Sequence, residues 1–435
     1  MNAPVTNRSS EKILQNLLTA SRRDAALHRD YLLQRRTGLE HIHALLVQQI
    51  EAAYPAAGDP LSTPGPASLP VSHPTLGQRR SLFTRQDLEE FASGSIARCL
   101  GEDFRIFDRR RGPRIPNGDL LLMSRVLELE GQPYQLDRPA HIQAEVDVPM
   151  DAWYVQPDST PDAPYSVLME MALQPCGFLS AALRTPLVYP ELDLYFRNLD
   201  GNGTVLFPVR LAGNTIQSSA QLVSTATTAG TIIQSFTFQL ALEGKTFFQG
   251  SAVFGYFRLD ALNNQNGLDG GPASRVPTVP ETLLPISNWQ LPGRSYLDQV
   301  SIQPGQESDY VYAQKRNHPG QWFYTCHFFE DPVMPGSLGI EALFQVLRIY
   351  AAQQGLLQPF HRPHYHLALN SPLAWKYRGQ ITPANRLIQL EATVRHTTGA
   401  QGEVPLLANA SLWVDQKRIY HIENAALQIT EGFER

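Results

Sequence analysis

Two apolar segments that carry the same polar residues at the same spacing most constrain what this 435-residue chain can fold into. Residues 164–174 read PYSVLMEMALQ, and residues 335–345 read PGSLGIEALFQ. In each segment a Glu stands six residues after the Pro and a Gln four residues after the Glu, among apolar or small neighbours. A helix that is apolar all round is buried inside a protein, so the two copies predict central helices over residues 166–183 and 336–354.

Alternating apolar and polar residues, which are typical of strands with one buried face, follow both helical segments. Residues 236–242 alternate up to a Glu243-Gly244 hairpin turn, and residues 388–394 and 419–422 repeat the pattern, the latter as an expected edge. A long apolar helix followed by antiparallel strands predicts a sheet wrapped around that helix. Two copies predict an α+β chain with two such units packed side by side.

The composition divides the chain into five parts. Residues 1–53 contain a helical repeat over 11–53, and this is either an amphipathic helix lying on the protein or a helix for dimerisation or docking. The Pro-rich residues 54–81 indicate an extended linker. Globular units over 82–260 and 286–435 flank a Gly-, Asn- and Pro-rich break over 261–285.

Charge and cysteine content narrow the function classes. The formal net charge of −5 provides no global basic field that would attract nucleic acid. No run approaches the ~20 apolar residues of a membrane span, the first residues lack the pattern of a secretory signal, and no CxxC pair occurs. We therefore expect a cytoplasmic, reduced protein with no membrane span.

Two shorter patterns in the first unit complete the structural expectations. Residues 87–100 predict a helix. The run DRRRGPR at 108–114 indicates a solvated charged face, or a surface that receives an acidic carrier protein.

The Glu of each central helix is the candidate acid. Glu170 and Gln174 lie four residues apart on one helical face, so the amide can orient the carboxyl group. Apolar surroundings disfavour the anion and should raise the pKa of Glu170, which favours a general acid. Glu341 has the same setting in the second helix. The alternative for each is a Glu that reaches solvent or satisfies a buried backbone group.

His327 is the candidate base. It lies on the segment that leads into the second helix, and a histidine beside aromatic residues is otherwise commonly a packed side chain. The helix start at Gly336 offers free backbone N–H groups and the positive end of the helix dipole, which suit a developing oxyanion. An imidazole, an acid and these free N–H groups together favour a reaction that removes a proton from the carbon next to a carbonyl.

Several segments resemble one enzyme family. Residues 327–345, HFFEDPVMPGSLGIEALFQ, resemble the active-site segment of bacterial β-hydroxydecanoyl-ACP dehydratase/isomerases, which are hot-dog proteins. Residues 168–183 and 193–201, LMEMALQPCGFLSAAL and DLYFRNLDG, resemble the tandem dehydratase region of bacterial polyunsaturated fatty acid synthases and related lipid and polyketide synthases. Residues 113–126 and 144–153 resemble the first strands of that family. The resemblance covers about residues 82–430.

The resemblance implies a double hot-dog in which the two units share a site. The catalytic histidine of one unit, His327, would work with Glu170 of the other, and Gln174 would orient Glu170. Glu341 would face Asp158, which follows Trp153 by five residues as His327 follows Trp322. No histidine lies between residues 153 and 170, so the resemblance implies one active site and one relic.

The implied reaction is removal of water from (3R)-hydroxyacyl thioesters on acyl carrier protein, in fatty-acid or polyketide-type biosynthesis. It needs no metal or redox cofactor, because the phosphopantetheine of the carrier holds the substrate. The isomerases carry Asp where this chain has Glu170 and Glu341, and commonly Cys where it has Ser337. Isomerisation of a 2-enoyl to a 3-enoyl chain, thioester hydrolysis and a non-catalytic acyl-carrier docking scaffold remain alternatives. The HRPHYH run at 361–366 indicates surface or packing histidines rather than a metal site.

Overall fold

The computed structural model describes most of the chain from residue 81 onward. The helix expected over 11–53 and nearly all of the linker expected over 54–81 lie outside the described residues. No helix in the described part is long and apolar enough to cross a membrane. The described residues are 81–228, 230–271, 276–289, 291, 293–397 and 403–432.

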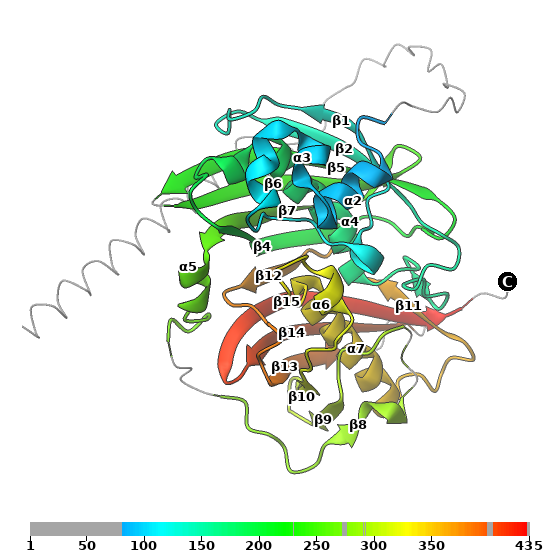
Figure 1. Ribbon diagram of the computed structural model, residues 1–435. Helices are drawn as coiled ribbons and strands as arrows, with labels where there is room; N and C mark the ends of the chain where they lie inside the picture. The colour runs from blue at the N-terminus through cyan, green and yellow to red at the C-terminus, as the bar shows by residue number, and fades with distance from the viewer. Residues whose placement is uncertain are drawn as a thin grey trace, which may run out of the picture. The chain divides into compact units, whose positions relative to one another are not determined.

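The first unit wraps an antiparallel sheet around helix α4 (Tyr165–Ala182), as Figure 1 shows. Two short helices, α2 (Arg85–Ser93) and α3 (Ile96–Leu100), precede the sheet, and α5 (Leu259–Asn263) follows it. The strands are β1 (Arg125–Glu130), β2 (Ala140–Asp147), β3 (Ser159–Thr160), β4 (Leu194–Val205), β5 (Thr215–Thr228), β6 (Thr231–Leu242) and β7 (Lys245–Arg258). The 3-10 turns are η1 (Glu102–Asp108), η2 (Gly118–Leu120) and η3 (Thr185–Leu187).

The second unit repeats this plan around helix α7 (Gly336–Gln353). A short helix, α6 (Phe323–Cys326), and a 3-10 turn, η4 (Ile286–Asn288), come before α7. The strands are β8 (Leu284–Pro285), β9 (Gln299–Gln303), β10 (Asp309–Arg316), β11 (Pro363–Leu367), β12 (Leu373–Tyr377), β13 (Leu387–His396), β14 (Val404–Val414) and β15 (Lys417–Glu431).

The two sheets join edge to edge through β4 and β12. These strands pair antiparallel, with Leu373 opposite Gly203 and Lys376 opposite Asp200. One strand order therefore runs through both units, β1-β2-β5-β6-β7-β4-β12-β15-β14-β13-β10-β9-β8, and β11 and β3 pair beside it. Inside, α4 packs against α7. The α+β double hot-dog predicted from the sequence is confirmed.

Helix α4 is buried along almost its whole length. Every residue of α4 other than Leu173 is buried, as its apolar sequence predicts. Pro175 lies inside the helix and has no N–H to donate to the carbonyl of Met171. The hydroxyl of Ser218, on β5, donates to that carbonyl at 2.7 Å instead. The sheet thus supplies the hydrogen bond that the proline removes.

The single helix expected over 87–100 is wrong, because the chain forms two short helices there. The N–H of Gly94 donates to the carbonyl of Glu90 at 3.0 Å and closes α2. The guanidinium of Arg114 then donates to the carbonyls of Glu90, Phe91 and Gly94 at 3.3, 3.0 and 2.8 Å. A buried arginine therefore holds the break between α2 and α3.

The strand expected over 113–126 begins only at Arg125, where β1 starts. Pro113 and Pro116 have no N–H for a strand ladder, so this stretch cannot pair as a sheet interior does. The other expected first strand, over 144–153, overlaps the end of β2 and then leaves the sheet.

Of two further predictions about the strands, the hairpin is confirmed and the sheet edge is wrong. The hairpin at Glu243 and Gly244 is confirmed: both residues have positive φ, 51° and 79°, as a tight turn between β6 and β7 requires. The edge expected at 419–422 is wrong. This segment lies inside β15, where Ile422 is paired with Ala410 of β14 on one side and Trp375 of β12 on the other.

Candidate active site

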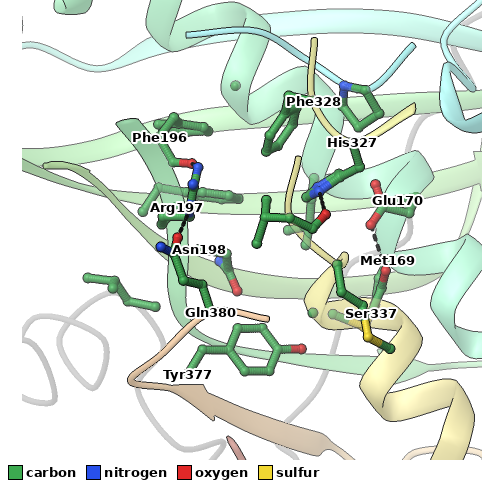
Figure 2. Close-up of a pocket in the computed structure, with 18 of the residues that line it drawn as sticks. Met169, Glu170, Phe196, Arg197, Asn198, His327, Phe328, Ser337, Tyr377 and Gln380 are labelled. Carbon is green, nitrogen blue, oxygen red and sulfur yellow. Dashed lines mark hydrogen bonds between the residues drawn. The ribbon is translucent and has the colours of Figure 1, made fainter. Parts of the chain in front are cut away.

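A cavity of about 100 Å³ lies where the two units meet, and Figure 2 shows the side chains around it. Helix α4 and strand β4 of the first unit supply one part of its wall. The segment after α6, the start of α7 and the end of β12 supply the other part. The lining includes four of the residues expected from the sequence, Glu170, Gln174, His327 and Gly336.

The backbone carbonyl of Val333 holds the His327 ring in one tautomer. Its Nδ1 lies 2.9 Å from the carbonyl oxygen of Val333. A carbonyl can only accept a hydrogen bond, so Nδ1 carries the hydrogen and Nε2 keeps its lone pair. Burial lowers the pKa of His327 to about 4, with the positive charge of Arg197 acting in the same direction. The imidazole is therefore neutral at physiological pH and can act as a base.

Glu170 is a buried carboxyl group with two hydrogen-bond donors. The hydroxyl of Ser337, on α7, donates to its Oε1 at 2.6 Å, and Nε2 of Gln174 donates to its Oε2 at 3.3 Å. Burial raises the pKa of Glu170 above its ordinary value, against the opposing effect of these two hydrogen bonds. The proton is therefore held more tightly than in an exposed glutamate, as a general acid requires.

Gln174 also makes hydrogen bonds to the backbone, which its spacing from Glu170 did not predict. Its Nε2 donates to the carbonyl of Leu120 at 2.7 Å, and its Oε1 accepts from the N–H of Leu122 at 3.0 Å. These bonds are shorter than the bond to Glu170. The side chain therefore fixes the irregular segment before β1 as well as contacting the carboxyl group.

Gly336 begins α7 and leaves room for a neighbouring aromatic ring. A Cβ at this position would lie 2.5 Å from the ring of Tyr377. The N-cap residue, Pro335, makes no side-chain capping bond. The first N–H groups of α7 therefore keep the capacity to bind an oxygen in the cavity.

An ion-pair cluster beside the site is the main feature that the sequence did not reveal. Asp331, in the segment after His327, accepts from Arg197 at 2.7 and 2.8 Å and from Arg111 at 2.5 Å. Burial alone would raise the pKa of Asp331, but the two guanidinium groups outweigh it and the pKa is lowered. Arg111 also lies 3.5 Å over the ring of Tyr195. The cluster ties the histidine-bearing segment to the first unit.

The solvated face expected over 108–114 is therefore wrong for part of that run. Arg111 is committed to Asp331, and Arg114 is 7% exposed and holds the α2–α3 break. Arg110 does lie near the surface, where it pairs with Asp193. The DRRRGPR sequence could not show which arginines are buried and which is near the surface, because the residues that they contact are distant in the sequence.

Of the other two expected residues, Glu341 lines a second and smaller cavity of about 20 Å³, and Asp158 contacts Arg348, which also lines that cavity. The hydroxyl of Ser166 donates to Glu341 at 3.2 Å. Burial raises the pKa of Glu341 to about 7, and the charge of Arg348 opposes this. Asp158 accepts from the Arg348 guanidinium at 3.0 Å. The guanidinium of Arg348 thus acts on both carboxyl groups.

The guanidinium of Arg348 makes several further contacts beside this smaller cavity. Besides Asp158, it donates to Gln156 at 3.1 Å and to Ser159 at 2.5 Å, and it lies 4.0 Å over the ring of Tyr365. It stands thirteen residues after the Pro that precedes its helix, where the first helix has Gly177. This difference between a glycine and an arginine at equivalent positions was the sequence feature that indicated a difference between the two cavities.

Two of the three histidines of the HRPHYH run contact hydroxyl groups. His364 lies 2.8 Å from the hydroxyl of Thr160, and His366 lies 3.0 Å from that of Thr430. Among the described residues, no group of three or more His, Cys, Asp or Glu side chains is placed to hold a metal ion.

The fold and the shared cavity define a double hot-dog protein. Residues 295–423, within the second unit, match the family described as the FabA-like domain, so the second unit carries a FabA-like domain. The chain is also 31% identical over 387 residues to a relative from Thraustochytrium sp., a component of polyunsaturated fatty acid synthase. The aligned region is 80% of this chain and 26% of that relative, so the chain spans about a quarter of the relative's length.

Solved hot-dog structures are similar only at a distance. The 12:0-ACP thioesterase from Umbellularia californica has a TM-score of 0.40 and 10% identity, over 66% of this chain and 93% of that one. The bifunctional dehydratase-cyclase domain in ambruticin biosynthesis has a TM-score of 0.36 and 10% identity, over 72% and 96%. Similarity at this level does not identify an activity.

Proposed function

We propose that this chain is a dehydratase that removes water from (3R)-hydroxyacyl thioesters to give 2-enoyl thioesters. The observation that carries the proposal is that His327 and Glu170, from different units, line one cavity in complementary states. Burial lowers the pKa of His327 to about 4 and raises the pKa of Glu170, so a neutral base lies in the same cavity as a carboxyl group that holds its proton more tightly than an exposed glutamate does.

The base step begins at Nε2 of His327. This nitrogen takes the proton from the carbon next to the thioester carbonyl, and the negative charge develops on the carbonyl oxygen. The free N–H groups and the positive dipole end at the start of α7, beside Gly336, stabilise that charge. Val333 holds Nδ1 at 2.9 Å and keeps the ring oriented throughout.

The acid step uses Glu170. Its proton passes to the departing β-hydroxyl, the C–O bond breaks, water leaves and the double bond remains. A proton then moves from His327 to Glu170 to restore the starting state. In the alternative route His327 itself delivers the proton to the hydroxyl, and Glu170 only orients that group. Each general acid–base contribution is typically worth about 10²–10⁴-fold in rate.

The relative supports the proposal of a carrier-bound substrate. That relative is named as a component of a polyunsaturated fatty acid synthase, so we propose acyl chains on the phosphopantetheine of a carrier protein or carrier domain. The reaction would belong to fatty-acid or polyketide-type biosynthesis. The reaction as written needs no metal or redox cofactor, since every step is a proton transfer or a bond cleavage.

Product identification tests the proposal directly. A series of (3R)-hydroxyacyl chains on a carrier domain is incubated with the full chain, and the thioesters are followed by mass spectrometry and NMR. Loss of one water with a 2-enoyl product supports the dehydratase. A 3-enoyl product or free acid would assign isomerisation or hydrolysis instead, and no conversion at any chain length would favour a docking scaffold.

A further inference from the structure

Tyr377 is a buried residue of the cavity whose hydroxyl has no partner. It is the last residue of β12, lines the cavity and is 6% exposed. Its hydroxyl oxygen makes no hydrogen bond to any described residue. A buried polar group without a partner costs folding free energy, so native proteins seldom keep one without a use.

The hydroxyl lies at the start of α7. A Cβ built on Gly336 would be 2.5 Å from Cε2 of Tyr377 and 3.1 Å from its Oη. Figure 2 shows the ring below the cavity, with the hydroxyl on the side that faces Ser337 and α7. The unpartnered donor therefore stands beside the free N–H groups of the helix N-terminus.

The equivalent residue of the first unit shows that the fold needs only the ring. Phe196 stands before Arg197 as Tyr377 stands before Arg378. Each arginine donates to the carbonyl of the residue before it, at 2.9 and 2.7 Å. Each also reaches the facing strand or its extension, since Arg197 donates to Gln380 at 3.0 Å and Arg378 donates to Asp200 at 2.8 Å. A phenyl ring without a hydroxyl group is therefore sufficient at the equivalent position of the first unit.

We propose that the hydroxyl of Tyr377 donates a hydrogen bond to the thioester carbonyl oxygen of the substrate, next to the N–H groups at the start of α7. Tyr377 is then a catalytic residue of the proposed dehydration, on which this assignment rests. Burial holds the pKa of Tyr377 well above its ordinary value, so the hydroxyl stays protonated and remains a donor. A second preorganised donor at a developing oxyanion lowers the barrier to proton abstraction.

Tyr377→Phe gives the first test, because it removes the hydroxyl and keeps the ring. The kcat for dehydration should fall about 10²-fold, the effect of losing one oxyanion donor. The melting temperature should stay equal or rise, because no internal hydrogen bond is lost. Tyr312→Phe is the matched control: the hydroxyl of Tyr312 donates to Gln314 at 2.9 Å and accepts from Gln389 at 2.9 Å. That variant should lose thermal stability and keep kcat.

Two inert ligands test which substrate atom Tyr377 contacts. A 3-hydroxyacyl amide of pantetheine keeps the carbonyl, and the matching thioether lacks it; both keep the β-hydroxyl. Tyr377→Phe should weaken the Kd of the amide about 3- to 10-fold and leave that of the thioether unchanged. Equal weakening of both ligands, or no weakening of either, would overturn the proposal.

These binding measurements do not depend on turnover. If product identification found no dehydration, a selective loss of amide binding would still place Tyr377 at the carbonyl, and the proposed reaction alone would fail. If dehydration occurred but amide binding were unaffected, the assignment of Tyr377 would fail and the reaction would stand.

Discussion

Glu170 and Glu341 stand at equivalent positions on the two central helices, yet their surroundings differ. Glu170 shares a cavity of about 100 Å³ with His327. The space beside Glu341 is about 20 Å³, and Arg348 occupies its edge. The first helix has Gly177 where the second has Arg348, and Gly177 lines the larger cavity while Arg348 lines the smaller one.

Equivalent serine and glutamine side chains nevertheless accompany the two carboxyl groups. Ser337 donates to Glu170 at 2.6 Å, and Ser166 donates to Glu341 at 3.2 Å, each across the helix pair. Gln345 accepts from a backbone N–H at 2.9 Å and donates to a carbonyl at 2.8 Å, as Gln174 does in the first unit. These residues therefore hold the fold in both units. The histidine and the open space distinguish the site from its counterpart.

Replacing His327 should have the largest effect. His327→Ala removes the proposed base for the α-proton, so kcat should fall about 10³-fold. Binding of the inert amide ligand should change little, because the imidazole acts on a proton rather than on the carbonyl. Steady-state kinetics and calorimetry check both. Residual activity near the wild-type level would show that another group is the base.

The paired glutamates test the comparison itself. Glu170→Gln removes the transferable proton and should lower kcat about 10²-fold. Glu341→Gln should leave kcat close to the wild-type value, because the cavity beside Glu341 is only about 20 Å³ and Arg348 lines it. Equal losses in the two variants, with both folded by circular dichroism, would show that the second place is also active.

Asp331 should matter for stability as well as for rate. Asp331→Asn leaves the guanidinium groups of Arg111 and Arg197 buried without a counter-charge, which costs about 3–5 kcal/mol of unfolding free energy. It should also lower kcat, because Asp331 fixes the segment that carries His327. Urea unfolding measures the stability change.

The matched control for Asp331 is an exposed ion pair. Asp193→Asn breaks the bond to Arg110, where the aspartate is 57% exposed, and should cost at most about 1 kcal/mol. A similar cost for the two variants would mean that the Asp331 cluster contributes no more than a surface pair.

The pH dependence of stability gives the smallest expected effect. Burial raises the pKa of Glu341 from 4.5 to about 7, so between these values the folded state binds more protons than the unfolded state. The free energy of unfolding therefore falls as pH rises through this window. Glu341→Gln removes this contribution and should flatten the decline in melting temperature between pH 4.5 and 7. An unchanged slope would contradict the raised pKa.

The central helices were predictable because their signal is local. An apolar run longer than four turns can only be buried, and α4 and α7 lie within a residue of the expected segments 166–183 and 336–354. The paired Glu and Gln were readable for the same reason. The partnership of His327 with Glu170 came from the resemblance, since nothing in the spacing of residues 170 and 327 relates them.

The sequence by itself determined the two helix-and-sheet units and the residue types of the candidate acid and base. Only the tertiary structure decided that Arg111 and Arg197 meet Asp331, that Arg348 fills the second place, and that the hydroxyl of Tyr377 is left without a partner among the described residues. Secondary structure follows from patterns a few residues long. These contacts depend on the register by which β4 and β12 join two sheets, and strand pairing at that range leaves no periodic trace in the chain.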